Sequence, residues 1–380
     1  MAWIIEALKE RGLSTAMRVA LRYMLGRLRG VDDIIKCALC PNFCKFNCPT
    51  HIASGSETHS PAGRARVAFF IESGVLELNP ENALPLYTCL GCLACKAYCP
   101  FNFSVPEITY RLRVRLRQAN ALPVQLAQIV DNLSRHKFLH GPRPAEDRIA
   151  GNLLYIRGCT VRQHLPSLAE ITMEVFKRFG VTLATHADEV CCGFHAYLLG
   201  AEDIFRDLAK MSIELLKKYS CAITSCPTIA YTYRVLYPRF GFQLPIEVYH
   251  VTELLKRVMS EQQVKLREVR KKVVVHESWP LSRGIETSNV MLDLLKSIPG
   301  VEVALPIRHG RYVYDIGGYC SLLKFVNQWL VRRIAQERLR ELSTVGNIIV
   351  TSSPDATIVF RELGANVYDI VEVMAEALGL

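Results

Sequence analysis

The sequence predicts an α-helical N-terminal domain followed by two α/β domains that are copies of one another. Up to about residue 147 the apolar residues recur at helical spacing, and no segment alternates as a strand does. From residue 150 short apolar runs of strand length alternate with helical segments, which is typical of a parallel sheet covered by helices. The same order begins again near residue 270, which indicates an internal duplication with a period of about 120 residues.

The composition is that of a globular protein with many cysteines. Half of the 380 residues are apolar, and this length suggests two or three domains. Charged residues such as Glu6 and Lys9 stand where a signal peptide needs an apolar core, and no stretch approaches the roughly 18 apolar residues of a membrane-spanning helix. We therefore expect a cytoplasmic protein whose 14 cysteines are metal ligands, reactive thiols or buried small hydrophobes rather than disulfides.

Basic residues outnumber acidic ones, with a formal net charge of +10. They are dispersed along the chain without an aromatic-interleaved motif, so no nucleic-acid partner is predicted. The first 30 residues form a basic amphipathic helical segment. Two interpretations remain open for it: peripheral contact with the inner face of the cell membrane, or packing against the domain behind it or a partner.

Residues 31–147, the predicted helical domain, contain two cysteine motifs. CLGCLACKAYCP (89–100) matches the bacterial ferredoxin pattern C-x2-C-x2-C-x3-C-P, whose fourth cysteine binds the other cluster of a pair. CALCPNFCKFNCP (37–49) is the same motif with one extra residue in its loop. Sulfur ligands at this spacing select iron–sulfur clusters or zinc, and the repeated C-x3-C-P ending favours two [4Fe–4S] clusters.

Two such motifs allow each to complete the cluster of the other. The predicted ligands of the first cluster are Cys37, Cys40, Cys44 and Cys99, and those of the second are Cys48, Cys89, Cys92 and Cys95.

The two α/β domains are predicted over residues 148–268 and 269–380. The first has expected strands at 153–156, 181–185 and 221–224, with helices at 165–179 and 202–219. The second has expected strands at 271–279, 301–306 and 347–354, with helices at 285–295, 322–342 and 371–378.

A third set of cysteines follows the strands of the first α/β domain. Ligand sites of open α/β sheets lie at the carboxyl ends of the strands, so these thiols are expected to converge on a third cluster. The alternative is a group of unrelated buried thiols. The predicted ligands are Cys159, Cys191, Cys192 and Cys226, whereas Cys221 and Cys320 are expected to be core thiols.

Other candidate residues are interpreted as structural. His51, His195, His250 and His276 are expected to be hydrogen-bonded polar groups. Arg64 and Arg66 either neutralise the charge of a cluster or solvate a helix. No phosphate loop, dinucleotide fingerprint, Ser-His-Asp set or paired carboxylates are present, so no catalytic residue is predicted.

This order of motifs resembles the iron–sulfur subunits that serve flavin dehydrogenases, such as those of anaerobic glycerol-3-phosphate dehydrogenase and of glycolate oxidase. It is also similar to heterodisulfide reductase subunits of the D and B type, which share the cysteine-rich (CCG) domain. The resemblance covers residue 35 to the end. It is specific at the two ferredoxin-type motifs and at RGCTVRQHLP (157–166), DEVCCG (188–193), TSCP (224–227) and YHVTELL (249–255).

The resemblance implies an α-helical ferredoxin domain followed by two CCG domains, but the chain departs from the pattern. Ile229 stands where the first CCG domain usually has its last cysteine, which leaves four thiols and favours a third [4Fe–4S] cubane over a five-cysteine noncubane cluster. The second domain has lost its ligands and is expected to be degenerate. Its substituted positions are Trp279, Asp315, Ile316 and Ser353.

The implied function is electron transfer by a non-catalytic subunit. Electrons would pass from an FAD-dependent dehydrogenase subunit, acting on a 2-hydroxy acid or glycerol 3-phosphate, to a quinone, a membrane anchor subunit or another carrier. The alternative is a subunit that reduces a disulfide at the third cluster, as heterodisulfide reductases do.

Overall fold

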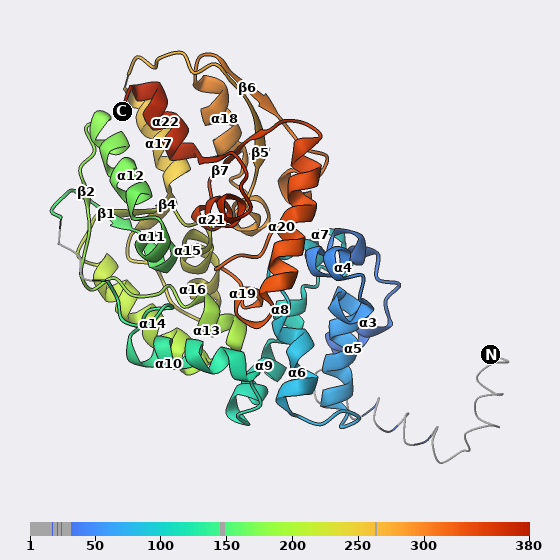
Figure 1. Cartoon of the computed structure of the whole chain (residues 1–380). Helices are drawn as coiled ribbons and strands as arrows, with labels where there is room; N and C mark the ends of the chain where they lie inside the picture. The colour runs from blue at the N-terminus through green and yellow to red at the C-terminus, as the bar shows by residue number, and fades with distance from the viewer. Residues whose placement is uncertain (1–16, 18–20, 22–23, 25–31, 145–148, 263) are drawn as a thin grey trace.

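The computed structural model describes residues 17, 21, 24, 32–144, 149–262 and 264–380 (Figure 1). The predicted amphipathic segment, residues 1–30, thus lies almost entirely outside the described residues. The remaining chain forms a helical part followed by two α/β units, with the second unit returning to the helical part through a long helix.

The helical part is a set of short helices joined by cysteine-bearing loops. Proline occupies the first position of several helices, where its missing N–H costs nothing, and Ser60 and Asn79 cap two of them through their side chains. The predicted helix over 107–118 is divided in two at Thr109. The elements are α3 (Asp32–Leu39), η1 (Phe43–Asn47), α4 (Pro49–Ser54), η2 (Glu57–His59), α5 (Pro61–Glu72), α6 (Pro80–Tyr87), α7 (Ala94–Tyr98), α8 (Val105–Ile108), α9 (Tyr110–Gln118), η3 (Val124–Leu126) and α10 (Ala127–Arg135).

The first α/β unit has a four-stranded parallel sheet of order β2-β1-β3-β4. The sheet carries helices in its connections, as parallel strands require. Its elements are β1 (Leu153–Ile156), α11 (Gly158–His164), α12 (Pro166–Arg178), β2 (Leu183–Ala184), α13 (Phe194–Leu199), α14 (Glu202–Leu216), β3 (Cys221–Thr224), α15 (Pro227–Tyr231), η4 (Thr232–Leu236), α16 (Tyr237–Arg239), β4 (Glu247–His250) and α17 (Val251–Glu261).

The second unit has a parallel sheet of the same topology, with order β6-β5-β7-β8. The two connectivities match strand for strand, which is the arrangement that a duplication produces. Its elements are β5 (Lys271–His276), η5 (Pro280–Gly284), α18 (Asn289–Ser297), β6 (Val301–Ala304), η6 (Gly310–Tyr312), α19 (Leu323–Val326), α20 (Gln328–Ser343), β7 (Ile348–Thr351), α21 (Pro354–Glu362), β8 (Val367–Asp369) and α22 (Ile370–Leu378).

Several elements differ from the sequence prediction. Strands β4 and β8 and helix α21 were not predicted. Strand β4 ends at His250 and β8 ends at Asp369, and the side chain of each caps the next helix in a capping box. The helix therefore follows the strand directly, and no turn residues in the sequence mark the boundary between them. The predicted helix over 322–342 is broken at Asn327, whose side chain caps α20 by accepting from the Leu330 N–H.

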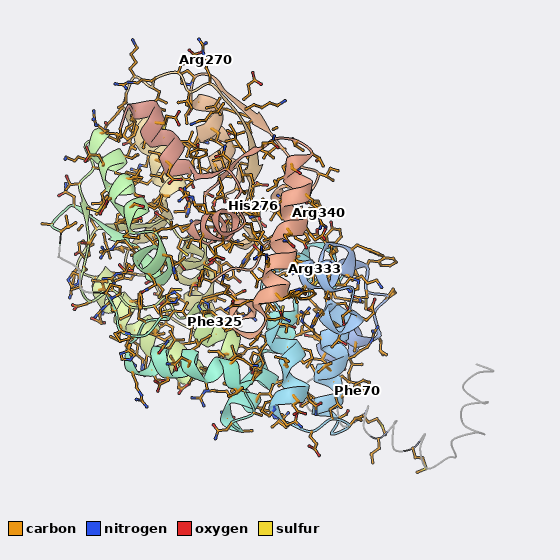
Figure 2. All side chains as sticks on the ribbon, in the orientation of Figure 1. Phe70, Arg270, His276, Phe325, Arg333 and Arg340 are labelled. Carbon is orange, nitrogen blue, oxygen red and sulfur yellow. The ribbon has the colours of Figure 1, made fainter. Side chains whose placement is uncertain are left out.

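The helical part is packed against both α/β units. One continuous apolar core contains Leu90 and Leu93 of the helical part, Phe194 of the first unit and Trp279 of the second. Helix α20 contacts α4, and Figure 1 shows it running beside the blue helices of the helical part. Side chains fill the space between these elements, with Arg333 and Arg340 along α20 (Figure 2).

A buried arginine ties the helical part to the first unit. The Arg113 guanidinium on α9 is 1% exposed and donates to the Leu198 carbonyl on α13 at 2.8 Å and to the Leu86 carbonyl at 2.8 Å. Gly200 passes so close to α9 that an added Cβ would lie 2.4 Å from the Arg113 carbonyl carbon. The cysteine loops are therefore held in fixed positions relative to the sheets.

Candidate metal centres

The first set of cysteines lines a cavity of about 250 Å³ at the surface of the helical part. Cys37 lies on α3, Cys44 lies on η1, and Cys40 and Cys99 follow α3 and α7. Asn42 takes the left-handed conformation in the loop between them, with φ of 69°. The four cysteines that the motif pairing assigns to the first cluster thus share one cavity, which Cys95 also reaches. These four are Cys37, Cys40, Cys44 and Cys99.

The thiols of this cavity lie close together in an apolar setting. Burial, together with the neighbouring Cys99 and Cys40, raises the pKa of Cys37 to about 12. Burial, together with the neighbouring Cys37 and Cys48, likewise raises the pKa of Cys44 to about 12. Four such thiolates repel one another unless a cation lies between them, so the donor set is suited to a cationic iron core.

The second set lines a small cavity of about 20 Å³ behind the first. Its loop is tightly turned, with Gly91 at φ of 74° and Leu93 at φ of 57°. Burial raises the pKa of Cys92 and of Cys95. This cavity again gathers the four cysteines that the motif pairing assigns to one cluster, namely Cys48, Cys89, Cys92 and Cys95.

A buried arginine lies directly beside the second set. The Arg64 side chain is 1% exposed, and its Nη1 lies 3.9 Å from the Cys48 sulfur. Its other described hydrogen bonds go to carbonyl oxygens of His59, Pro85 and Thr88 and to hydroxyls of Thr50 and Thr88. None of these acceptors is a carboxylate. A buried cation without an anionic residue calls for an anion next to it, and a thiolate-ligated cluster is one.

Arg66 behaves differently. It is exposed, and its Nε donates to the Ala38 carbonyl at 2.9 Å at the end of α3. Of the two arginines, only Arg64 is therefore enclosed with the sulfur ligands.

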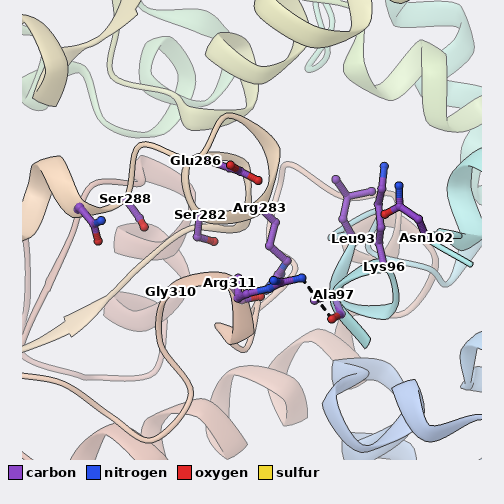
Figure 3. Close-up of a pocket in the computed structure, with 11 residues that line it drawn as sticks. Leu93, Lys96, Ala97, Asn102, Ser282, Arg283, Glu286, Ser288, Gly310 and Arg311 are labelled. Atoms are coloured by element: carbon purple, nitrogen blue, oxygen red, sulfur yellow. Dashed lines mark hydrogen bonds between the residues drawn. The ribbon is translucent and has the colours of Figure 1, made fainter. Parts of the chain in front are cut away.

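The loop of the second set is also fixed by the second α/β unit. Arg283 donates from Nε to the Cys92 carbonyl at 2.9 Å and from Nη1 to the Val313 carbonyl at 2.7 Å. Arg311 reaches the Ala97 carbonyl across the adjoining cavity of about 520 Å³, as the dashed line in Figure 3 shows. Burial raises the pKa of Cys92, and the Arg283 cation opposes that rise. The second unit thus supplies positive charge to this centre.

The third set of cysteines converges at the carboxyl ends of β1 and β3. The neighbouring Cys159 thiol and burial raise the pKa of Cys191, and the neighbouring Cys191 thiol, burial and the nearby Cys226 raise the pKa of Cys192. Gly158 and Gly193, which are next to Cys159 and Cys192 in the sequence, have φ of 74° and 87°. Glycine adopts this left-handed conformation without steric cost. The structure therefore brings together all four thiols that the sequence assigned to the third cluster.

Glu189 positions the loops of this third set, a role that sequence reasoning missed. Its carboxylate accepts the backbone N–H of Gly158 at 2.6 Å and of Arg157 at 3.3 Å. Burial raises the pKa of Glu189. The carboxylate thereby ties the loop of Cys159 to the loop of Cys191, and the only sequence signal was an acidic residue two positions before the cysteine pair.

The second and third sets are in contact through one helix. A Cβ added to Gly91 would meet Leu198 at 3.1 Å and Phe194 at 3.5 Å, and both belong to α13. Helix α13 begins directly after Cys192 and Gly193. The three sets therefore follow one another through the protein, with Cys95 shared between the first two cavities.

The corresponding positions of the second unit hold no cysteines. Trp279 is 4% exposed, and its ring packs on Tyr231 and Phe194 at centroid distances of 4.8 and 5.8 Å. Asp315 and Ser353 line a small cavity of about 20 Å³, and burial raises the pKa of Asp315 to about 7. Ile316 is buried.

The four histidines have hydrogen-bond partners, as structural residues should. His51, His195, His250 and His276 pair with the Ser56 carbonyl, the Tyr319 carbonyl, the Ser225 carbonyl and the Arg338 guanidinium, respectively. In the part of the chain that the structure describes, no three Cys, His, Asp or Glu side chains converge closely enough to hold a single metal ion. The first two cysteine sets instead line two neighbouring cavities that share Cys95.

Two family models match the chain at these centres. A 4Fe-4S dicluster domain matches residues 33–103, and a Cysteine-rich domain matches residues 153–229. The chain is therefore an iron–sulfur protein in which a dicluster domain precedes a cysteine-rich domain. The match of the cysteine-rich domain covers the first α/β unit only, so the assignment of the second unit as its copy stays a prediction.

The chain is similar to several oxidoreductases and oxidoreductase subunits. It is 24% identical to the D subunit of dihydromethanophenazine:CoB–CoM heterodisulfide reductase from Methanosarcina barkeri, over 93% of this chain and 95% of the relative. It is 41% identical to the probable glycolate oxidase iron-sulfur subunit of Bacillus subtilis over 87 residues, 23% of this chain and 19% of that one. It is 24% identical to the EtfAB:quinone oxidoreductase of Syntrophomonas wolfei, over 86% of this chain and 51% of the relative.

These matches confirm the resemblance seen in the motifs. Among the described residues, no helix has the length and apolar character needed to cross a bilayer.

Proposed function

We propose that this chain is a relay of three [4Fe–4S] clusters between a flavoprotein dehydrogenase and a quinone or another carrier. The observation that supports it most is the succession of three thiol sets joined by contacts, the first at the surface and the third inside the first α/β unit. When bound, the clusters accept and release single electrons. The residues of the chain hold the clusters at fixed separations and set their potentials.

The ligands proposed for the first two clusters are cysteines that line the two cavities, and those proposed for the third are the thiols that follow the strands of the first α/β unit. Arg64 and Arg283 place positive charge beside the second cluster, which favours its reduced form. Under this proposal the second α/β unit is a degenerate, cluster-free copy that serves as a scaffold for the helical part. The ligands are Cys37, Cys40, Cys44 and Cys99 for the first cluster, Cys48, Cys89, Cys92 and Cys95 for the second, and Cys159, Cys191, Cys192 and Cys226 for the third.

Reduction of a disulfide at the third site is less well supported. Ile229 packs so tightly on Gly158 that a Cβ there would lie 2.3 Å from its Cδ1. An apolar side chain that cannot bind iron therefore lies beside Cys159. A relay needs no substrate space at this point, whereas a disulfide substrate does.

Iron analysis tests the number of clusters. Three cubanes predict about twelve iron atoms and as many sulfides per chain when the protein is purified without oxygen. Quantitative iron and acid-labile sulfide assays measure both. A value near eight would remove the third cluster, and stoichiometric zinc would contradict all three.

An aromatic face surrounds the cavity of the first cluster and is the proposed contact for the flavoprotein. Exposed aromatic side chains mark sites of protein association, and a cluster beneath them lies within reach of a bound partner. The aromatic face comprises Phe43, Phe46, Tyr98 and Phe101, which are 68%, 69%, 42% and 55% exposed.

Phe46→Glu is expected to weaken the partner's binding about 10-fold or more while leaving iron content unchanged, because Phe46 does not line the cavity. The measurement is the affinity for the flavin-containing subunit that co-purifies with the full chain. Met211→Glu on α14 is the matched control, since Met211 is an exposed apolar residue of the first unit. Equal affinities in both variants would place the contact elsewhere.

The proposal that the electron acceptor is a quinone in the membrane is supported by the name of one relative and by the basic N-terminal segment. One relative is named a quinone oxidoreductase, and quinones reside in membranes. Under this proposal the basic residues 1–30 hold the subunit at the inner face of the membrane.

A further inference from the structure

The cavity of about 520 Å³ beside the loop of the second cysteine set lies between the helical part and the second α/β unit. Leu93, Lys96 and Ala97 line it from the helical part, and residues of η5, the start of α18 and η6 line it from the second unit. Small-molecule sites have volumes of roughly 300–1,000 Å³, so this cavity has room for a molecule much larger than a water or a single ion.

Three cationic side chains line this cavity. Figure 3 shows Arg283 and Arg311 next to each other, with Lys96 on the facing segment. Nη1 of Arg283 donates to the Arg311 carbonyl at 3.2 Å, which holds the two cationic residues side by side. Neighbouring like charges repel each other unless an anion compensates them.

Backbone carbonyls, which carry no charge, are the hydrogen-bond acceptors of the two arginines. Arg283 donates to the carbonyls of Cys92, Val313 and Arg311, and Arg311 donates to that of Ala97 at the long distance of 3.4 Å. None of these acceptors is a carboxylate. The positive charge of Arg311 in particular is exposed and only weakly hydrogen-bonded.

The remaining lining is polar and leaves a net positive charge. Helix α18 begins at Asn289, and the side chain of its cap, Ser288, makes no capping hydrogen bond, so the positive end of the helix adjoins the cavity. Lys96 lies 3.6 Å from the Glu107 carboxylate, which is outside the lining. Glu286 is exposed and is the one carboxylate among the described residues that line the cavity, against three cations.

We propose that this cavity binds a small polyanion that carries phosphate or carboxylate groups. Arg311, Arg283 and Lys96 supply the charge, and guanidinium groups bind both kinds of oxyanion through paired hydrogen bonds. The site goes beyond the relay, because binding requires no cluster. Under the proposed function the bound anion also offsets the charge that Arg283 places beside the Cys92 carbonyl, which makes the second cluster harder to reduce.

The test is calorimetric titration of the full chain, purified without oxygen, with inorganic pyrophosphate and with citrate. Low ionic strength is used because salt screens exposed charges. We expect one site per chain and a Kd of about 1 mM or lower for at least one of the two probes. The tighter probe shows whether phosphate or carboxylate is preferred, and binding of neither would overturn the proposal.

Arg311→Ala is expected to weaken binding about 10-fold or more, because it removes the exposed cation of the lining. Arg333→Ala is the matched control, since Arg333 is an exposed arginine of α20 outside the cavity and the variant loses the same charge. Equal weakening in both variants would show non-specific attraction to a basic surface and would overturn the site.

Asn289→Asp covers a failure of Arg311→Ala to fold. A carboxylate in the first turn stabilises a helix, so this variant favours α18, yet its negative charge repels an anion in the cavity. Its affinity for the probe should also fall about 10-fold. A parental affinity in Asn289→Asp would contradict the placement of the anion here.

Redox titration followed by EPR separates the site from the proposed function. Saturating probe is expected to lower the potential of the second cluster in the parent and to leave it unchanged in Arg311→Ala. Binding without such a shift would place the anion away from Arg283 and overturn the assignment. Iron analysis decides independently whether the cluster exists, so failure of the site and failure of the relay give different results.

Discussion

Replacing Cys192 by serine is expected to remove the third cluster and to lower electron transfer to the acceptor by at least about 100-fold. Cys192 follows Cys191 and precedes Gly193 and α13, which contacts the loop of the second cluster. A serine oxygen is a poor ligand for this iron, and losing the ligand leaves the relay without its last centre. Iron should fall from about twelve to about eight per chain, with the first two EPR signals retained.

The control for this variant lies in the second unit. Ser353→Ala changes the position that corresponds to Cys226 and is expected to leave iron content and electron transfer unchanged, because Ser353 belongs to the unit that is proposed to hold no cluster. Full iron and full activity in Cys192→Ser would show that the adjacent cysteines are buried thiols. Loss of iron in Ser353→Ala would show that the second unit binds a cluster.

Replacing Arg64 by methionine is expected to lower the potential of the second cluster and to destabilise the chain by about 3–5 kcal/mol. The cation lies beside the Cys48 sulfur and donates to carbonyls of Pro85 and Thr88. Removing it leaves those acceptors unpaired and leaves the reduced cluster without its counter-charge, so reduction becomes harder. Redox titration followed by EPR measures the potential, and denaturant unfolding of the loaded chain measures the stability.

Arg66→Met is the matched control for Arg64, because Arg66 is an exposed arginine of the same helix. Arg64→Lys keeps the charge and loses the planar fork, so it should retain most of the potential and lose part of the stability. An unchanged potential in Arg64→Met would mean that the guanidinium only satisfies backbone carbonyls.

The sequence predicted those features that depend on local spacing. The ferredoxin-type motifs grouped the cysteines as the two cavities do, since each loop is one short segment and the proline turn directs the fourth thiol. Strands β1 and β3 were predicted at their observed residues because they are buried apolar runs. Strands β4 and β8 were missed because they are short and run directly into capped helices.

The features that sequence reasoning missed depend on contacts between distant segments. The Glu189 carboxylate accepts the backbone N–H of Gly158, and the Arg113 guanidinium donates to the Leu198 carbonyl. No spacing rule joins such pairs, since the fold alone brings them together. The same holds for Arg283, which reaches the Cys92 carbonyl from the other end of the chain.

The packing of the second cluster's loop also has a consequence for biosynthesis. The Cys89–Cys95 loop is covered by residues made last by the ribosome: Arg283 holds the Cys92 carbonyl, and a Cβ on Gly317 would lie 2.2 Å from Leu90. A nascent chain that has grown only to residue 268 lacks both contacts. The packing of this loop is therefore completed only after the C-terminal unit has been synthesised and has folded against it.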